Sequence, residues 1–97
     1  MPLALSTRQV AFLRSRAHDL EARLQLGKAG ASETFRDQLG QALARDELVK
    51  VRIGKHVEED LDAVATALGA VVVQRVGRVA ALYRPADPPR LQLPDGA

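Results

Sequence analysis

A short strand-like run leads directly into a glycine-rich loop and then into a helix start, so any fold for this chain has to join a strand to a helix here. The run is Arg23-Leu24-Gln25-Leu26, the loop is Gly27-Lys28-Ala29-Gly30, and Ser32 offers a helix cap. Glycine lacks a Cβ and accepts positive φ, so the loop backbone is open to a bulky anion. Loops with this glycine spacing clamp the RNA backbone in KH domains. A turn without further function has the same pattern, and the spacing leaves both interpretations open.

The rest of the chain alternates between helical and extended patterns of apolar residues. Helices are predicted at about 7–19, from about residue 33 onward, and at about 57–68; strands are predicted at 23–26, 48–53, 70–76 and 79–84. Gly69 follows the third helix at a position that usually ends one, and Gly77-Arg78 predicts a two-residue hairpin turn. The order α-β-α-β-α-β-β predicts a two-layer α/β fold, in which three helices pack on one face of a four-stranded mixed sheet and leave the other face open.

Length and composition indicate one domain and a tail. The chain has 97 residues, 46% of them hydrophobic, which is enough for one two-layer core. We expect the domain to span residues 5–85, and the prolines that follow residue 84 predict a flexible tail at 86–97. Because no apolar stretch approaches the roughly 20 residues of a membrane span, and no signal-peptide pattern is present, we expect a cytoplasmic protein without a membrane partner.

Few residues offer catalytic or metal chemistry. The chain has no cysteine, and its two histidines, His18 and His56, make a poor metal set, so no metal or cofactor is expected. The acidic residues Glu58, Glu59, Asp60 and Asp62 are expected on the exposed first turn of the third helix. The glycine loop also lacks the longer pattern of a nucleotide-binding P-loop. We therefore expect neither enzymatic activity nor a small-molecule substrate.

The charge is unevenly distributed, although the net charge is only +2. Five basic residues lie between Arg8 and Lys28, against Asp19 and Glu21. Segregated positive charge suggests an anionic partner, although a mixed solvated surface gives a similar count.

Several blocks of the chain, in order, carry a resemblance to a known family. They are Leu13-Arg14 with Ala17-His18 and Leu20, Leu26-Gly27-Lys28-Ala29-Gly30, Ala42-Leu43 followed by residues 47–52, and Val76-Gly77-Arg78 with residues 82–85. Together they resemble the CRM domain, the chloroplast RNA splicing and ribosome maturation module, in its bacterial stand-alone YhbY-like form. The family has the same element order, with a core similar to the C-terminal domain of bacterial translation initiation factor 3.

This resemblance implies RNA binding without catalysis. For the stand-alone bacterial members it implies a role in ribosome biogenesis, with 23S ribosomal RNA or pre-50S particles as the partner, and we expect a monomer. The resemblance also implies that Gly27, Lys28, Ala29 and Gly30 contact the RNA backbone, assisted by the amides that open the second helix. Glu21-Ala22 replaces a lysine and a proline common in the family, which removes a positive charge before the first strand.

Four further basic residues are candidate RNA contacts, and each of them also fits an ordinary surface position without function. Arg14 and Arg23 are predicted to flank the glycine loop, while Lys50 and Arg52 are predicted to project from the open sheet face toward a second RNA segment. All four residues also fit a solvated surface. Tyr83 is predicted at an edge of the sheet, since readers that stack bases on a sheet use several aromatics.

Two other functions remain open from the sequence. A protein-interaction adaptor would dock its acidic third helix on a basic partner, and a DNA-binding protein would use the same basic surface as the RNA-binding one.

Overall fold

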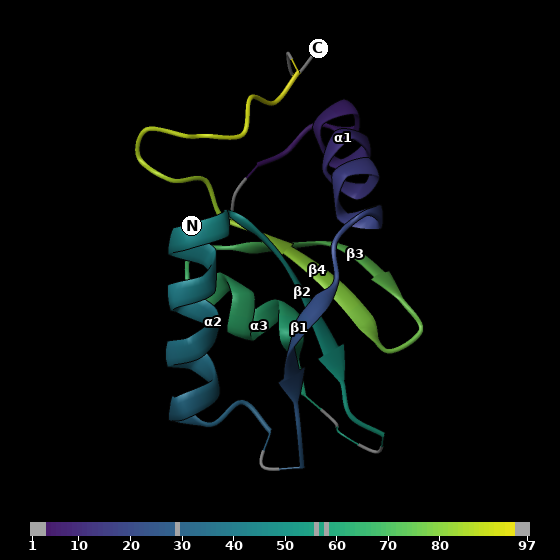
Figure 1. Ribbon diagram of the computed structural model, residues 1–97, viewed down its shortest axis with the longest axis vertical. Helices are drawn as coiled ribbons and strands as arrows, with labels where there is room; N and C mark the ends of the chain where they lie inside the picture. Colours follow the sequence, from purple (N-terminus) through teal and green to yellow (C-terminus); the bar gives the residue numbers. More distant parts are fainter. Residues whose placement is uncertain (1–3, 29, 56, 58, 95–97) are drawn as a thin grey trace.

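The chain folds into a four-stranded sheet with helices on both faces (Figure 1). The computed structural model describes residues 4–28, 30–55, 57 and 59–94. The elements are α1 (Thr7–His18), β1 (Ala22–Leu26), α2 (Glu33–Asp46), β2 (Leu48–Ile53), α3 (Leu61–Ala67), β3 (Val71–Val76) and β4 (Val79–Tyr83). The predicted α/β class, the order α-β-α-β-α-β-β and the mixed sheet are confirmed.

The strands lie in the order β1-β2-β4-β3. β1 and β2 are parallel, with Leu26 beside Ile53, and β4 is antiparallel to both β2 and β3. The predicted hairpin turn at Gly77-Arg78 joins β3 to β4, and Gly77 has a φ of +58°. Because β1 and β2 run the same way and β4 runs against them, the ends of β1 and β2 and the start of β4 share one edge.

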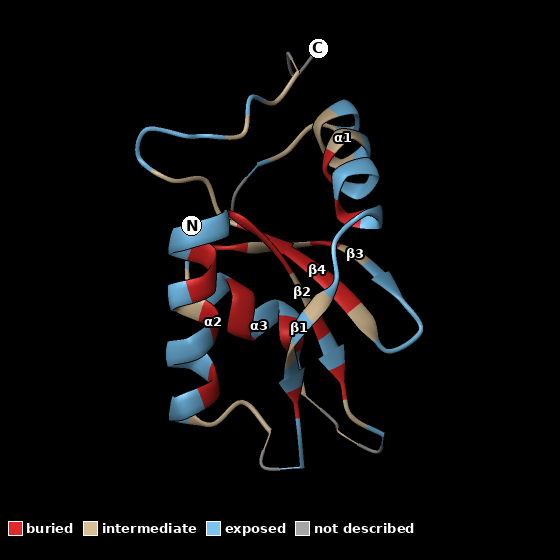
Figure 2. Cartoon of the chain, in the orientation of Figure 1, coloured by how far each residue is buried: buried red, intermediate tan, exposed pale blue. Residues whose placement is uncertain are grey.

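One face of the sheet packs against α2 and α3 to form the main core (Figure 2). Alternation along β2 turns Val49, Val51 and Ile53 toward these helices, where all three are buried. Burial of each such side chain contributes about 1.5–3 kcal/mol to folding. At the start of α2, the hydroxyl of Ser32 accepts a hydrogen bond from the Phe35 amide at 3.2 Å, as the predicted cap requires.

The first helix packs on the opposite face, so the expectation that all three helices share one face is wrong. Leu13 and Ala17 of α1 are fully buried in a second cluster with Leu48 and Tyr83. Leu48 is the one apolar residue that β2 contributes to this face, because the next two side chains pointing the same way are basic. The remaining apolar surface under α1 comes from β3, β4 and the C-terminal segment, far away in the sequence.

The third helix is shorter than predicted and begins at Leu61 rather than near Val57. Its cap is Asp60, whose carboxylate accepts a hydrogen bond from the Ala63 amide at 3.1 Å. Val57 is a loop residue that packs against the core. Because it is apolar, the sequence pattern includes it in the predicted helix. The helix ends before Gly69, which has a φ of +72°, as predicted.

A buried carboxylate, Glu47, connects the segment after β4 to the domain. Its side chain accepts hydrogen bonds from the amides of Ala86 at 2.9 Å, Arg90 at 3.0 Å and Leu91 at 3.0 Å, and the residue is 1% exposed. The Nε atom of Arg90 lies 3.5 Å from the same carboxylate. The sequence predicts a flexible tail at 86–97, and the structure places the described part, residues 86–94, in contact with the domain.

These contacts set the charge state of Glu47. Burial raises the pKa of this carboxyl group, but the three amide hydrogen bonds and the charge of Arg90 outweigh it, so the pKa lies below the ordinary value of 4.5. A carboxylate with a lowered folded-state pKa adds stability above its unfolded pKa, and this stability is lost as the pH falls through the folded value. Burial and the nearby Glu47 charge also raise the pKa of Tyr83.

We predict that Glu47→Gln lowers the free energy of unfolding at pH 7 by about 1.5–3 kcal/mol, because charge-assisted hydrogen bonds are replaced by weaker ones. The difference from the wild type should shrink as the pH falls from about 4.5 toward the lower folded-state pKa. Urea unfolding at a series of pH values measures both effects. Asp37→Asn, which removes an exposed carboxylate of α2, is the matched control and should differ little from the wild type; a constant gap between wild type and Glu47→Gln across pH would contradict the prediction.

Candidate nucleic-acid interface

The glycine loop joins β1 to α2 at the sheet edge where the two parallel strands end (Figure 1). The Gly30 amide donates a hydrogen bond to the Gly27 carbonyl at 2.9 Å, which closes a tight turn, and Gly30 has a φ of +70°. Gly27 and Lys28 are exposed, and Ala29 lies outside the described residues. A Cβ on Gly27 would meet no described atom within 4 Å. The backbone at Gly27 is therefore open to a ligand from solvent.

The other glycine is covered by the carboxylate of Glu59. Its Oε1 accepts a hydrogen bond from the Ala31 amide at 2.7 Å, and a Cβ on Gly30 would lie 2.5 Å from the same oxygen. The expectation that Glu59 is an exposed residue of the third helix is wrong, because it precedes α3 and is half-buried against the loop. An anion is favoured near a helix N-terminus. At the start of α2 this anion is the Glu59 carboxylate.

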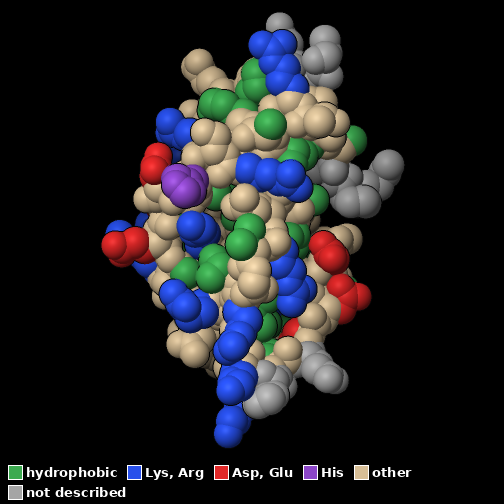
Figure 3. Space-filling view, turned by 90° about the vertical axis from the view of Figure 1, so that its right-hand side faces the viewer, with side chains coloured by type: hydrophobic (Ala, Val, Ile, Leu, Met, Phe, Trp, Pro, Cys, Tyr) green, Lys and Arg blue, Asp and Glu red, His purple; other side chains and the backbone are tan. Residues whose placement is uncertain are grey.

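Basic residues from three segments lie at this edge. The Gly54 amide donates to the Leu26 carbonyl at 2.8 Å, which places the loop after β2 beside the loop after β1. The Ile53 amide donates to the Arg78 carbonyl at 2.6 Å, which brings the β3–β4 turn to the same place. We call the exposed basic residues of these segments, together with Arg52 near the end of β2, the basic end: Lys28, Arg52, Lys55 and Arg78. Figure 3 shows the side of the molecule that lies on the right in Figure 1. Lysine and arginine side chains gather in its lower part, the end at which the loops lie.

Two members of the basic end, Lys28 and Arg52, were singled out from the sequence, and two, Lys55 and Arg78, were missed. Lys55 follows its strand by two residues, just as Lys28 follows β1. That parallel was visible in the sequence, but only the pairing of β1 with β2 and of β2 with β4 brings these residues to one edge.

Arg14 does not flank the loop. It lies on α1, the helix near the opposite end of the sheet (Figure 1). Its Nε donates a hydrogen bond to the Val73 carbonyl of β3 at 2.8 Å. The expectation was wrong because it placed α1 on the same face as the other helices.

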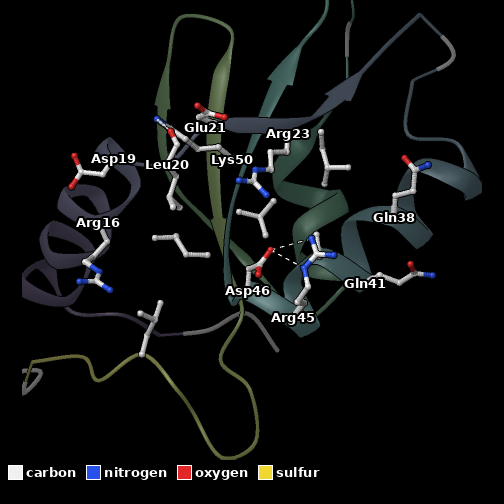
Figure 4. A pocket seen from close by; sticks show the side chains of 15 residues that line it. Arg16, Asp19, Leu20, Glu21, Arg23, Gln38, Gln41, Arg45, Asp46 and Lys50 are labelled. Carbon is white, nitrogen blue, oxygen red and sulfur yellow. Dashed lines mark hydrogen bonds and ion pairs between the residues drawn. The ribbon is translucent and has the colours of Figure 1, made fainter.

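Arg23 and Lys50 lie away from the basic end and line a groove between α1, β1 and α2 (Figure 4). Arg23 is exposed on β1. Lys50 is half-buried, and its Nζ donates a hydrogen bond to the Leu20 carbonyl at 3.0 Å. Lys50 therefore does not project freely from an open sheet face.

The remaining candidates are accounted for by packing and capping. Tyr83 lies on β4, between β2 and β3, so the predicted edge position is wrong. It is 2% exposed, and its ring is not available to stack on a base. Asp60 caps α3, while His56 and Glu58 lie outside the described residues.

Within the described part of the chain, no three His, Asp or Glu residues are grouped to hold a metal ion. The described helices also include none that is long and apolar enough to cross a membrane.

Comparison with known proteins identifies relatives of the whole domain. The chain is 38% identical over 84 residues to the protein named "Probable RNA-binding protein YqeI" of Bacillus subtilis, covering 82% of this chain and 88% of that protein. It is 34% identical over 94 residues to a protein of Haemophilus influenzae named "RNA-binding protein", covering 93% and 95% of the two chains. The solution structure of the hypothetical protein SAV1595 from Staphylococcus aureus is similar with a TM-score of 0.73 and 29% identity, covering 94% of this chain and 100% of that one.

The family model of the CRS1/YhbY (CRM) domain matches residues 5–84. This range contains all the helices and strands described above, together with the glycine loop. The chain therefore belongs to the CRS1/YhbY (CRM) domain family.

Proposed function

We propose that this protein is a non-catalytic RNA-binding protein that contacts 23S ribosomal RNA in pre-50S particles during ribosome assembly in the cytoplasm. The family membership and the names of the two relatives support RNA as the partner. The observation that carries the proposal is the basic end, in which four exposed cations lie in or beside a loop whose first glycine is open to solvent.

The basic end suits a phosphate backbone better than a base edge. At Gly27 the missing side chain lets a phosphate approach the main chain, while Lys28 and Lys55 supply charge from adjacent loops. Contacts of this kind fix the position of an RNA without reading its sequence. We therefore expect binding that weakens with salt and depends on RNA shape. We also propose that the protein acts as a monomer.

We predict that Lys28→Glu lowers the RNA association constant about 5–10-fold at about 100 mM salt. The slope of log K against log salt should become shallower by about one, as expected for the loss of one phosphate contact. Because Lys28 is exposed, the variant should keep the fold. A fluorescence-anisotropy titration with a structured fragment of 23S RNA measures affinity, and circular dichroism measures folding.

The matched control for this experiment is Arg8→Glu. Arg8 is an exposed residue in the first turn of α1, on the helix that lies near the opposite end of the sheet, so both variants carry the same net charge. Equal losses of affinity in the two variants would remove the loop from the site and leave only the total charge of the protein as the cause.

We predict that Glu59→Gln strengthens RNA binding about 2–5-fold, because it removes a negative charge beside the loop. A glutamine oxygen still accepts the hydrogen bond that the Ala31 amide now gives to Glu59, so the loop should keep its shape. Asp62→Asn removes an exposed carboxylate from the first turn of α3 and serves as the control in the same titration. Weaker binding by Glu59→Gln would show that the carboxylate is needed to shape the loop rather than competing with phosphate.

We predict that the protein sediments with large-subunit precursors in a sucrose gradient of cell lysate and moves to the top after ribonuclease treatment. This measurement tests the ribosomal target separately from RNA affinity. Migration at the top of the gradient in low salt without ribonuclease would contradict the assembly role. A search for a protein partner of the acidic residues at the start of α3 would then follow.

A further inference from the structure

A groove with a volume of about 790 Å³ runs between β1 and α2 and reaches the end of α1 (Figure 4). Its size is within the range of about 300–1,000 Å³ found for sites that hold small molecules, a range that accommodates a nucleotide. Its walls include β1 and α2, which are the elements that the glycine loop connects, and Leu48, Val49 and Lys50 of β2 also line it. No described loop residue lines the groove, but both elements continue from it to the loop, and Leu24 lies three residues before Gly27.

The half of the groove nearer the loop has an apolar floor and polar walls. Leu24 and Ala42 contribute apolar surface, Arg23 comes from β1, and the amides of Gln38 and Gln41 come from α2. The two glutamines are three residues apart, so they stand on the same side of the helix, and both are exposed. Figure 4 shows Arg23 on one side of the groove and the two glutamines on the other.

The acidic residues of the groove are gathered at its other half. Asp19 and Glu21 come from the connection between α1 and β1, and Asp46 comes from the end of α2. Asp46 forms an exposed ion pair with Arg45 at 3.1 Å. Among the described lining residues, the half nearer the loop thus has the Arg23 cation and two neutral amides, with no carboxylate.

We propose that the half of this groove nearer the loop binds one nucleotide of a single-stranded RNA segment that continues along β1, so that a phosphate farther along the same segment is held at the glycine loop. The base lies on the apolar floor, the Gln38 and Gln41 amides hydrogen-bond its edge, and Arg23 contacts the phosphate of that nucleotide. Side-chain amides carry both a donor and an acceptor, which is the combination that base edges present. This inference rests on the proposed function. It adds a site that contacts a base to the basic end, which contacts only the RNA backbone.

Continuity along the chain favours RNA over other occupants. β1 is an edge strand, so its outer side is not covered by another strand of the sheet. Arg23 and Leu24 of β1 line the groove, and the three residue steps from Leu24 to Gly27 extend about 10 Å, a distance that a short RNA segment spans. A free phosphate ion would need only the cations, and would leave the apolar floor and both glutamine amides without a role.

The test uses nuclear magnetic resonance of the full chain labelled with ¹⁵N. A short uridine oligonucleotide should shift the backbone amides of Gly27 and Lys28 and the side-chain amides of Gln38 and Gln41. Inorganic polyphosphate, which has charge but no base, should shift the loop amides and leave the glutamine side chains unchanged. Loop shifts without glutamine shifts in the oligonucleotide titration would overturn the groove inference while keeping the proposed function. An absence of shifts at both places, together with no binding of structured 23S RNA, would overturn both.

The double variant Gln38→Glu, Gln41→Glu provides the second arm. It should weaken binding of the uridine oligonucleotide at least about 10-fold, because two charges replace the amides that face the base and repel the phosphate. The matched control Ala63→Glu, Thr66→Glu adds two charges at exposed positions of α3, outside the groove, and should weaken binding less than about 3-fold. Equal losses in the two double variants would overturn the inference, since charge alone would then explain the effect. A Gln38→Asn, Gln41→Asn variant that keeps the amides but shortens them should show an intermediate loss.

Discussion

The parallel pairing of β1 with β2 is the constraint on which the candidate site depends. Parallel strands finish at the same edge, so the loops that follow them become neighbours, and the hydrogen bond between the Gly54 amide and the Leu26 carbonyl continues this pairing past the strands. Since β4 runs antiparallel to β2, its starting turn joins the same edge. Three short segments, each with little positive charge of its own, thereby form one basic surface that includes the glycine loop.

The sequence predicted the local structure of this protein better than its tertiary arrangement. The element order, the capped α2 and the hairpin at Gly77 follow from spacing and from residue chemistry, which act over a few neighbours. The side of the sheet on which α1 packs depends on apolar residues of β3, β4 and the C-terminal segment, so no pattern within α1 or β2 reveals it. The error at Arg14 followed from that one, because the position of a side chain depends on the face that its helix covers.

The candidate site was predicted in its centre and missed at its borders. The glycine loop and Lys28 were found because strand, glycines and helix cap are contiguous in the sequence. Lys55 and Arg78 were missed because only strand register brings them close. Glu59 was assigned to the third helix because the predicted helix begins near Val57, whereas its contact with the Ala31 amide joins two loops that are 28 residues apart. Contacts of that kind depend on the folded geometry and leave no periodic signal.

The buried Glu47 carboxylate has a consequence for where this domain ends. The family match stops at residue 84, and the last strand stops at Tyr83, so a boundary drawn from either would be placed before Ala86. A chain cut there keeps every helix and strand but loses three amide donors from a buried negative charge. Removing the partners of a buried charge is strongly unfavourable, because the carboxylate then has neither water nor protein to solvate it. The energetic unit of this fold therefore extends at least to Leu91, several residues beyond its last strand.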